Sequence, residues 1–147
     1  MNIIILGTNR EESNTLREVR KHYDLNDYEI VDLRKLKIAH WQYGEDKPID
    51  DFYLVVDKML QADHIVFATP VYWYAMSGYM KIFFDRLSDL ITAQKKKGRA
   101  LAGKTTELFC NGSDEQLPEG FEVPFKRTSE YFDMEFNKVT YVSTKDI

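Results

Sequence analysis

The chain has 147 residues, a length typical of a single domain. Hydrophobic residues make up 44% of it and charged residues 30%, a composition that supports a buried core without metals or disulfides. Its net charge of -4 argues against nucleic acid as the main partner. The single cysteine, Cys110, excludes an internal disulfide and a metal site made of cysteines alone.

The first residues, MNIIILGTNREE, carry no basic leader and too few consecutive apolar residues for a signal peptide or a membrane anchor. Together with the single thiol, this predicts a cytoplasmic protein without a membrane partner. Residues 111–113, NGS, match a glycosylation acceptor pattern, but we interpret them as a turn because Asn-Gly readily adopts positive φ.

Short apolar runs alternate with segments of helical periodicity along the chain. The apolar runs predict strands at residues 2–6, 29–33, 64–69, 105–110 and 137–142. The helical segments cover residues 13–23, a stretch from Asp50 or Asp51 to Leu60, residues 77–91, and a stretch from Pro124 to Phe132. Five strands and four helices in this alternation predict one α/β domain over residues 1–147, built on a parallel sheet with right-handed crossovers. The sequence ends just after the fifth strand, so we expect the final covering helix to be missing and a face near that strand to be exposed or covered by another subunit.

Ligands of open parallel sheets bind beyond the carboxyl ends of the strands, where the strand order reverses. The loop after the first strand, residues 8–15, offers hydroxyl, amide and guanidinium groups at the start of a predicted helix. Backbone N–H groups at a helix N-terminus favour an anion, and such side chains complete a phosphate cradle. The alternative is an ordinary capped loop with a solvated arginine. The two common phosphate motifs, G-x-x-x-x-G-K-[ST] and G-x-G-x-x-G, are absent, which disfavours a P-loop hydrolase and a standard dinucleotide fold.

Three aromatic residues, Tyr72, Trp73 and Tyr74, follow the third strand shortly after Pro70. Proline should end the strand there and leave the backbone of residues 71–74 free of the hydrogen bonds of the sheet. Such a loop can bind the edge of a heterocycle with its backbone while its rings stack on a flat π system. Alternatively, the rings cap the core or form a dimer contact. A phosphate cradle and an aromatic platform at one switch point predict a planar ligand with a phosphate tail, such as FMN.

Three blocks of the sequence, LGTNR with SNT, ATPVYW and KIFFDR, resemble the flavodoxin-like NAD(P)H-dependent FMN reductase family, which includes quinone reductases and iron–sulfur flavoproteins. The blocks lie within residues 6–15, 68–73 and 81–86. The resemblance implies a flavodoxin-like three-layer sandwich around a five-stranded parallel sheet with strand order 2-1-3-4-5. It also implies three groups of FMN contacts: the phosphate at Thr8, Arg10, Ser13, Asn14 and Thr15, the ring at Pro70, Val71, Tyr72, Trp73 and Tyr74, and a third edge at Asn111, Gly112 and Ser113.

Several positions depart from the family pattern or serve another purpose. The acidic pair at residues 11–12 lies beside the proposed phosphate, where it repels an anion unless both side chains face water. Residues 38–44 contain no cysteine, so an iron–sulfur cluster is excluded. Asp85 and Arg86 lie on the polar side of their predicted helix, which indicates a structural or interfacial role. The basic run at residues 95–99 is interpreted as a solvated loop, or else as a surface that attracts the phosphates of NADPH or an acidic partner.

The resemblance implies an FMN-dependent oxidoreductase that takes hydride from NADH or NADPH and passes it through FMN to a quinone, a free flavin or another small acceptor. The cofactor performs this chemistry, so we name no catalytic residue. No metal site is predicted, because the three histidines show no metal-ligand spacing. Two alternatives stay open: a flavodoxin-like electron carrier without NAD(P)H turnover, and a flavin-free relative that serves as an interaction domain. The surface near the aromatic loop also allows a homodimer.

Overall fold

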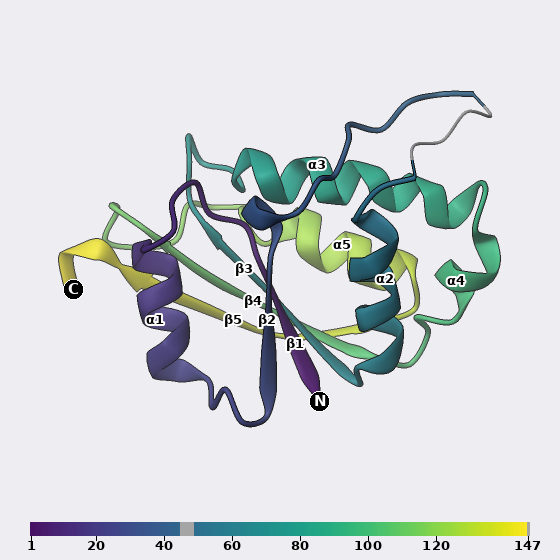
Figure 1. Cartoon of the computed structure of the whole chain (residues 1–147). Helices are drawn as coiled ribbons and strands as arrows, with labels where there is room; N and C mark the ends of the chain where they lie inside the picture. The colour runs from purple at the N-terminus through teal and green to yellow at the C-terminus, as the bar shows by residue number, and fades with distance from the viewer. Residues whose placement is uncertain (45–48, 147) are drawn as a thin grey trace.

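The computed structural model describes residues 1–44 and 49–146, and its centre is a parallel β-sheet (Figure 1). The strands are β1 (Asn2–Leu6), β2 (Tyr28–Asp32), β3 (His64–Pro70), β4 (Thr105–Gly112) and β5 (Glu135–Ser143). They are ordered β2-β1-β3-β4-β5, and every neighbouring pair is parallel. The strand order that the family resemblance implies is therefore confirmed, and so is the parallel sheet predicted from the alternation of elements.

Helices cover both faces of the sheet and make the three layers of a flavodoxin-like α/β fold (Figure 1). α1 (Asn14–His22) packs on one face, and α2 (Phe52–Gln61), α3 (Gly78–Arg86) and α5 (Val123–Tyr131) pack on the other. Shorter helical segments are η1 (Leu33–Lys35), η2 (Leu87–Ile91), α4 (Lys95–Arg99) and η3 (Thr144–Asp146). In the part of the chain that the structure describes, none of these helices has the length and apolar character needed to span a membrane.

Several predicted elements differ from the structure, and β5 is longer than its predicted residues 137–142. β4 continues two residues beyond its predicted end, because β3 and β5 pair with it on both sides there. The helix predicted over residues 77–91 changes into the 3₁₀ segment η2 after Arg86. The basic run at residues 95–99 forms α4 instead of a loop. Gly98 packs so closely on η2 that a Cβ atom would lie 2.2 Å from the carbonyl oxygen of Leu90.

Side chains of the central strands alternate between two apolar cores. The smaller core lies between the sheet and α1 and contains Ile4, Leu6, Leu16, Val19, Val66, Ala68 and Phe109. The larger core lies on the opposite face and includes one buried phenylalanine from each of three helices: Phe52, Phe83 and Phe125. Ile4 faces the smaller core while Ile3 and Ile5 face the larger one, as the two-residue period of a strand requires. Because both faces are covered, the strands appear in the sequence as continuous apolar runs.

Arg86 is fully buried, which corrects the prediction that it lies on the polar side of its helix. Its guanidinium group contacts Asp50 at 2.6 Å and Asp89 at 3.1 Å, and it donates to the carbonyl oxygen of Ala39 at 3.0 Å. The guanidinium carbon also lies 4.7 Å from the centre of the Phe52 ring. Arg86 therefore fixes the segment between β2 and α2 to the end of α3.

Asp50 caps α2 and pairs with Arg86 at the same time. Its carboxylate accepts hydrogen bonds from the backbone N–H groups of Ala39 at 2.9 Å and of Phe52 at 3.1 Å. Burial alone would raise the pKa of this carboxyl, but the hydrogen bonds from Arg86 and from the two backbone donors outweigh burial, so the pKa lies below its ordinary value. The predicted cap at the start of this helix is thus confirmed, and Asp50 rather than Asp51 supplies it.

Replacing Arg86 by methionine should lower the free energy of unfolding by about 3–5 kcal/mol, because two acids are left buried without their cation. Arg20→Met is a matched control: the Arg20 side chain is 49% exposed and, among the residues that the structure describes, pairs only with the exposed Glu12, so its loss should change stability by less than about 0.5 kcal/mol. Urea unfolding followed by circular dichroism at neutral pH measures both variants. Equal stabilities would contradict the structural role of Arg86.

Candidate functional site

The carboxyl ends of β1, β3 and β4 bring three loops together at one edge of the sheet, on the left of Figure 1. A cavity of about 310 Å³ lies between these loops. It is lined by residues from the loop after β1, the end of β3, the end of β4 and the residue after β5: Arg10, Ser13, Asn14, Thr15, Pro70, Val71, Tyr72, Asn111, Gly112, Ser113 and Thr144. All of them except Thr144 are residues that the family resemblance implies as FMN contacts.

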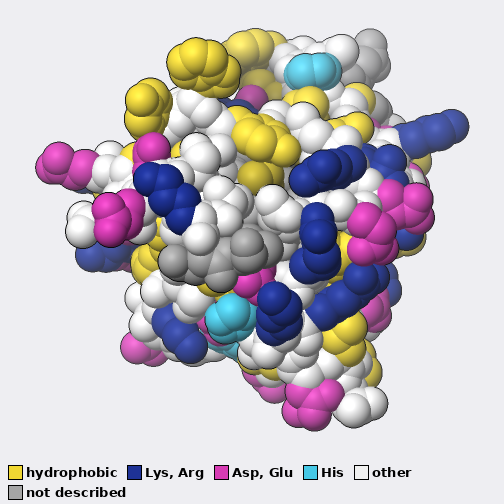
Figure 2. Space-filling model, turned by 90° about the vertical axis from the view of Figure 1, so that its left-hand side faces the viewer, with side chains coloured by type: hydrophobic (Ala, Val, Ile, Leu, Met, Phe, Trp, Pro, Cys, Tyr) yellow, Lys and Arg dark blue, Asp and Glu magenta, His cyan; other side chains and the backbone are white. Residues whose placement is uncertain are grey.

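Figure 2 looks onto this edge of the molecule, where hydrophobic side chains gather in the upper part and Lys and Arg side chains gather toward the centre and right. Among the described residues that line the cavity, Arg10 alone carries a charge, and its side chain is exposed. The rest of the lining consists of hydroxyl, amide, aromatic and backbone groups. The cavity therefore has one positive charge in otherwise neutral, polar surroundings.

The N-terminus of α1 forms one wall of the cavity. Ser13 caps this helix, because its Oγ accepts a hydrogen bond from the N–H of Leu16 at 3.0 Å. Oγ is the acceptor in that bond, so the hydroxyl hydrogen of Ser13 remains available to donate. Asn14 is oriented by Arg17, whose Nη2 donates to Asn14 Oδ1 at 2.8 Å and leaves the amide nitrogen of Asn14 as a donor. Together with the helix N-terminus, these groups favour an anion.

Thr15 and Asn111 join α1 to β4 at the cavity. Thr15 donates its hydroxyl hydrogen to Asn111 Oδ1, and both side chains are buried. Because the amide oxygen of Asn111 is occupied, its Nδ2 group is the part of the side chain that is left to donate. Thr8 is not among the lining residues: it is buried, and its hydroxyl donates to the carbonyl oxygen of Arg10 at 3.1 Å. The structure thus gives Thr8 the role of holding the loop in place.

β3 ends at Pro70, one residue beyond the predicted strand over residues 64–69, and Pro70 pairs with Asn111 of β4. The N–H of Val71 then donates to the carbonyl oxygen of Asn111 at 2.8 Å, so the backbone at Val71 is not free. N–H groups of successive strand residues point to opposite sides. With Val71 directed to β4, the missing N–H of Pro70 falls on the other side, where β1 has already ended opposite Ala68. The proline therefore removes no hydrogen bond from the sheet.

Trp73 and Tyr74 form a tight turn between Tyr72 and Ala75, whose backbone groups exchange hydrogen bonds of 2.8 and 3.0 Å. Both central residues have positive φ, 50° for Trp73 and 67° for Tyr74. Such a turn resembles type I′, which favours Asn-Gly, and a bulky side chain at positive φ costs about 1–2 kcal/mol. Both side chains are nevertheless exposed, Trp73 by 92% and Tyr74 by 70%. Two strained aromatic residues in solvent indicate a role in function rather than in stability.

A second cavity of about 170 Å³ adjoins the first one. It shares three lining residues with the first cavity and adds four more: Val71, Gly112 and Ser113 are common to both, and Trp73, Tyr74, Asp114 and Tyr141 complete it. A Cβ atom on Gly112 would lie 3.0 Å from the Tyr141 hydroxyl oxygen and 3.1 Å from Val71 Cβ. Glycine is therefore needed where β4 approaches the aromatic turn. Asn111 and Gly112 belong to β4, so the turn predicted at Asn-Gly is wrong.

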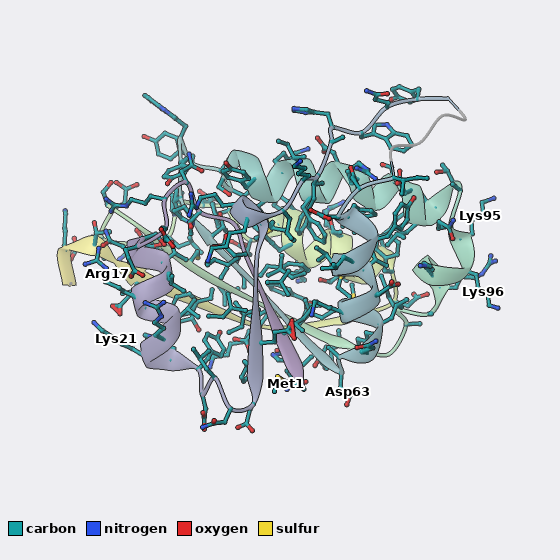
Figure 3. The ribbon with its side chains drawn as sticks, in the orientation of Figure 1. Met1, Arg17, Lys21, Asp63, Lys95 and Lys96 are labelled. Atoms are coloured by element: carbon teal, nitrogen blue, oxygen red, sulfur yellow. The ribbon has the colours of Figure 1, made fainter. Side chains whose placement is uncertain are left out.

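The charged residues that raised questions in the sequence do not line the two cavities. Glu11 and Glu12 are exposed and line neither cavity, and Glu12 pairs with Arg20 at 3.2 Å. Their carboxylates face solvent, which is the arrangement under which they oppose a bound anion least. Figure 3 shows Lys95 and Lys96 projecting from α4 at the end of the molecule opposite to these loops.

Sequence reasoning missed three residues that line the cavities: Asp114, Tyr141 and Thr144. Thr144 directly follows β5, so the rule on the carboxyl ends of strands would have found it if applied to the last strand. Asp114 lies one residue beyond the predicted third edge. Tyr141 gives no signal in the sequence, because only the register of β5 against β4 brings it beside Gly112.

Titratable groups elsewhere in the described part of the chain serve the fold. Burial raises the pKa of the Cys110 thiol to about 12, which keeps it protonated and unreactive. Glu107 contacts His64 at 2.6 Å and accepts a hydrogen bond from the Tyr23 hydroxyl at 2.8 Å. Burial opposes the ionisation of Glu107, but these two hydrogen bonds outweigh it and lower the pKa of Glu107. Among the described residues, no group of three or more His, Cys, Asp and Glu side chains is placed to hold a metal ion.

Comparison with known proteins establishes the family. The family model for NADPH-dependent FMN reductase matches residues 1–116. The chain belongs to the NADPH-dependent FMN reductase family. The matched stretch contains β1 to β4 and every nominated site residue from Thr8 to Ser113.

One curated relative is similar in sequence, and two solved structures are similar in fold. YwqN of Bacillus subtilis, named as an NAD(P)H-dependent FMN-containing oxidoreductase, is 37% identical over 72 residues, which are 48% of this chain and 38% of YwqN. The chain thus spans less than two fifths of the length of this curated relative. The solved structure of the Trp repressor binding protein of Bacillus subtilis has a TM-score of 0.79 at 22% identity, covering 97% of this chain and 84% of that one. General stress protein 14 of Treponema denticola, solved in complex with FMN, has a TM-score of 0.68 at 17% identity, covering 99% and 87%.

Trp73→Asn combined with Tyr74→Gly gives the aromatic turn the residues that its backbone favours. We expect the free energy of unfolding to rise by about 1–3 kcal/mol, because strain at two positive-φ positions is relieved. Tyr74→Ala is the control: it removes the ring but keeps a Cβ atom at positive φ, so it should give no gain. Denaturant unfolding followed by circular dichroism compares the variants, and a double variant no more stable than Tyr74→Ala would show that the turn is unstrained.

Proposed function

We propose that the two adjoining cavities hold FMN, and that the chain is an FMN-dependent oxidoreductase that takes hydride from NADH or NADPH and delivers it to a quinone, a free flavin or another small acceptor. The observation that carries this proposal is the convergence of the loops after β1, β3 and β4 on one cavity. Membership of the NADPH-dependent FMN reductase family supports both the cofactor and the reductant. The name of YwqN and the FMN complex of the Treponema protein agree with it.

The larger cavity has the donors that a phosphate group requires. Arg10 supplies the positive charge, Ser13 supplies a hydroxyl hydrogen, and the N-terminus of α1 supplies backbone N–H groups. Thr8 contributes indirectly, because it holds the carbonyl group of Arg10. Asn111 offers its Nδ2 group to a hydroxyl or phosphate oxygen of the ligand, in an orientation that Thr15 fixes. We therefore assign the phosphate end of FMN to this cavity.

The smaller cavity and the aromatic turn fit the flat ring of FMN. The N–H groups of Trp73 and Tyr74 have no backbone partner among the described residues, so they can donate to the polar edge of the ring. The side chains of Tyr72, Trp73 and Tyr74 provide aromatic surface that can pack against the ring and exclude water. Ser113, which lines both cavities, lies at the junction between the two ends of the ligand.

When bound, FMN supplies the hydride chemistry, so the side chains of this protein need only bind the cofactor, orient it and shield it. The positions of the titratable groups are consistent with a protein whose side chains bind the cofactor without catalysing proton transfer. Seven described groups with a clearly shifted pKa line neither cavity: Tyr23, Tyr28, Asp50, Tyr53, Arg86, Glu107 and Cys110. We accordingly assign no acid or base catalyst to the chain.

Location and partners are further parts of the proposal. The only cysteine, Cys110, is free and buried, as expected in a reducing compartment, and this supports a cytoplasmic location. The net charge of -4 gives no support to binding of nucleic acid, so we propose a small molecule as the electron acceptor. We also propose that the protein is a homodimer.

Flavin titration and an oxidoreductase assay test the proposal together. The purified protein should bind FMN with a change in the visible spectrum, and the loaded protein should oxidise NADH or NADPH when a quinone is present. Arg10→Ala should weaken FMN binding by about 10- to 100-fold and riboflavin binding by less than about threefold, because riboflavin lacks the phosphate. Lys96→Ala removes an exposed cation far from the cavities and should change neither affinity.

The alternatives give different results in the same experiments. Fast flavin reduction and oxidation without turnover of NADH or NADPH would identify an electron carrier. No uptake of FMN at all would overturn the proposal and favour a flavin-free interaction domain. Equal losses of FMN and riboflavin affinity in Arg10→Ala would contradict the assignment of the phosphate to Arg10.

A further inference from the structure

The edge of the sheet at β2 opens into a cavity of about 400 Å³. β2 is the first strand in the order of the sheet, so among the described strands β1 alone pairs with it. The cavity is lined by residues 29–32 of β2, by residues of α1 on one side and by residues of α2 on the other. Figure 1 shows β2 in front, between these two helices. The cavity shares no lining residue with the two flavin cavities.

The backbone of β2 has free hydrogen-bonding groups at this edge. The N–H of Asn2 donates to the carbonyl oxygen of Asp27 at 3.0 Å, which fixes how β1 and β2 are bonded. Backbone groups of successive strand residues point to opposite sides, so residues 29 and 31 face β1 and Ile30 faces away from it. The N–H and the carbonyl group of Ile30 have no backbone partner among the described residues. Both groups can therefore bond to another strand.

Apolar side chains border the free backbone on both sides. Ile30 is half-buried and packs with Leu16 against the smaller core, on the side of α1. On the side of α2, Leu54 is 46% exposed and Leu36 is half-buried. An extended segment placed along β2 would direct alternate side chains to these two surfaces. Free backbone groups between two apolar surfaces are what the addition of a strand at a sheet edge requires.

The rim of the cavity is positively charged, although the chain has a net charge of -4. Three cations line the cavity: Arg20, Lys35 and Lys58. The two acids in the lining are already engaged, because Asp32 accepts a backbone N–H at 3.0 Å and Glu29 pairs with Lys58 at 2.5 Å. Among the described residues, Lys35 has no ion pair and no side-chain hydrogen bond. Figure 2, which faces α1, shows Lys and Arg side chains gathered at its centre and right.

We propose that the β2 edge binds an extended segment of another protein as an additional strand, and that this segment is apolar in its middle and acidic at its ends. The cations at the rim attract acidic ends and repel basic ones. Charged side chains beside an edge strand also hinder unselective pairing of sheets, so the same cations make the edge selective. The inference goes beyond the proposed function. It is tested on flavin-free protein, and its failure would leave the flavin site untouched.

Two other occupants fit the cavity less well. A second copy of the chain would bring its own Arg20, Lys35 and Lys58 to the same edge, where cations would face cations. A small anionic molecule would satisfy Lys35 but leave the backbone of Ile30 without a partner. An acidic extended segment satisfies the cations and the free backbone groups together.

Phage-displayed random heptapeptides, selected on the flavin-free full chain, provide the probe. The enriched sequences should place acidic residues at the ends of an apolar stretch. The most enriched peptide, synthesised with blocked ends, should slow hydrogen exchange of the Ile30 N–H at least about tenfold in NMR spectra. The N–H groups of β5, the strand at the opposite edge of the sheet, should exchange as before.

Methylation of the peptide backbone tests strand addition without altering the protein. N-methyl groups on the alternate residues whose N–H groups face β2 should weaken binding at least about tenfold, because they remove those hydrogen bonds. N-methyl groups on the intervening residues should change the affinity less than about threefold, since their N–H groups point away from β2. Equal effects of the two methylation patterns would show that side chains alone bind, and would overturn the proposal.

Charge reversal tests the rim of the cavity. Lys35→Glu should weaken binding of the peptide at least about fivefold. Lys96→Glu is the matched control, because it reverses an exposed cation on α4 far from β2, and it should leave the affinity unchanged (Figure 3). Failure to enrich any peptide, enrichment of basic peptides, or equal effects of the two variants would each overturn the proposal. Unchanged exchange at Ile30 would do so too, and protection of Ile30 that rises with protein concentration without peptide would identify a second copy instead.

Discussion

Asn111 is the residue on which the geometry of the site depends, because it is tied to the neighbouring elements on both sides. Its side-chain oxygen accepts the hydroxyl hydrogen of Thr15 at the start of α1. Its backbone carbonyl accepts the N–H of Val71 at 2.8 Å, where the chain leaves β3. Its backbone also stands in register with Val142 of β5. The loops after β1 and β3 are therefore positioned relative to the end of β4 by hydrogen bonds, which is the kind of rigid support that a preorganised binding site needs.

This support explains how a strained turn can persist. Positive φ at Trp73 and Tyr74 costs a few kcal/mol, a large share of the roughly 5–15 kcal/mol by which a domain is stable. The turn is fixed before Tyr72 by the bond between Val71 and Asn111. After Ala75 it is fixed by Ser77, whose N–H donates to the buried Thr69 hydroxyl at 3.0 Å. With both ends held, the turn cannot relax without breaking hydrogen bonds of the core, so the aromatic rings stay at the mouth of the cavities.

Hydrophobic periodicity and capping patterns predicted an element correctly where its structure depends on its own short segment. They failed where a residue's environment depends on partners from distant parts of the chain. The apolar runs predicted β1 and β3, and the capping residue Ser13 predicted the start of α1. These predictions succeeded because burial of a strand and capping of a helix depend on a few consecutive residues. The prediction that the backbone after Pro70 is free was wrong at Val71, because its partner is the carbonyl group of Asn111 on β4, which lies far away in the sequence. Arg86 misled us because its main partner, Asp50, lies 36 residues away in the sequence. Most residues that line the two cavities were predictable, since the carboxyl ends of neighbouring parallel strands lie at the same edge of a sheet.

The position of α3, which follows the aromatic turn, is fixed at both ends of the helix. A Cβ atom on Gly7 would lie 3.0 Å from Ser77 Oγ and 3.2 Å from the backbone nitrogen of Met80, so α3 can start against the end of β1 only because residue 7 is glycine. At its other end the helix is anchored by Arg86, which is fully buried. A helix fixed at both ends behaves as a rigid connection. The aromatic turn therefore leads directly into a helix whose position is fixed. Ordering this turn in advance reduces the conformational entropy that a flavin has to remove on binding.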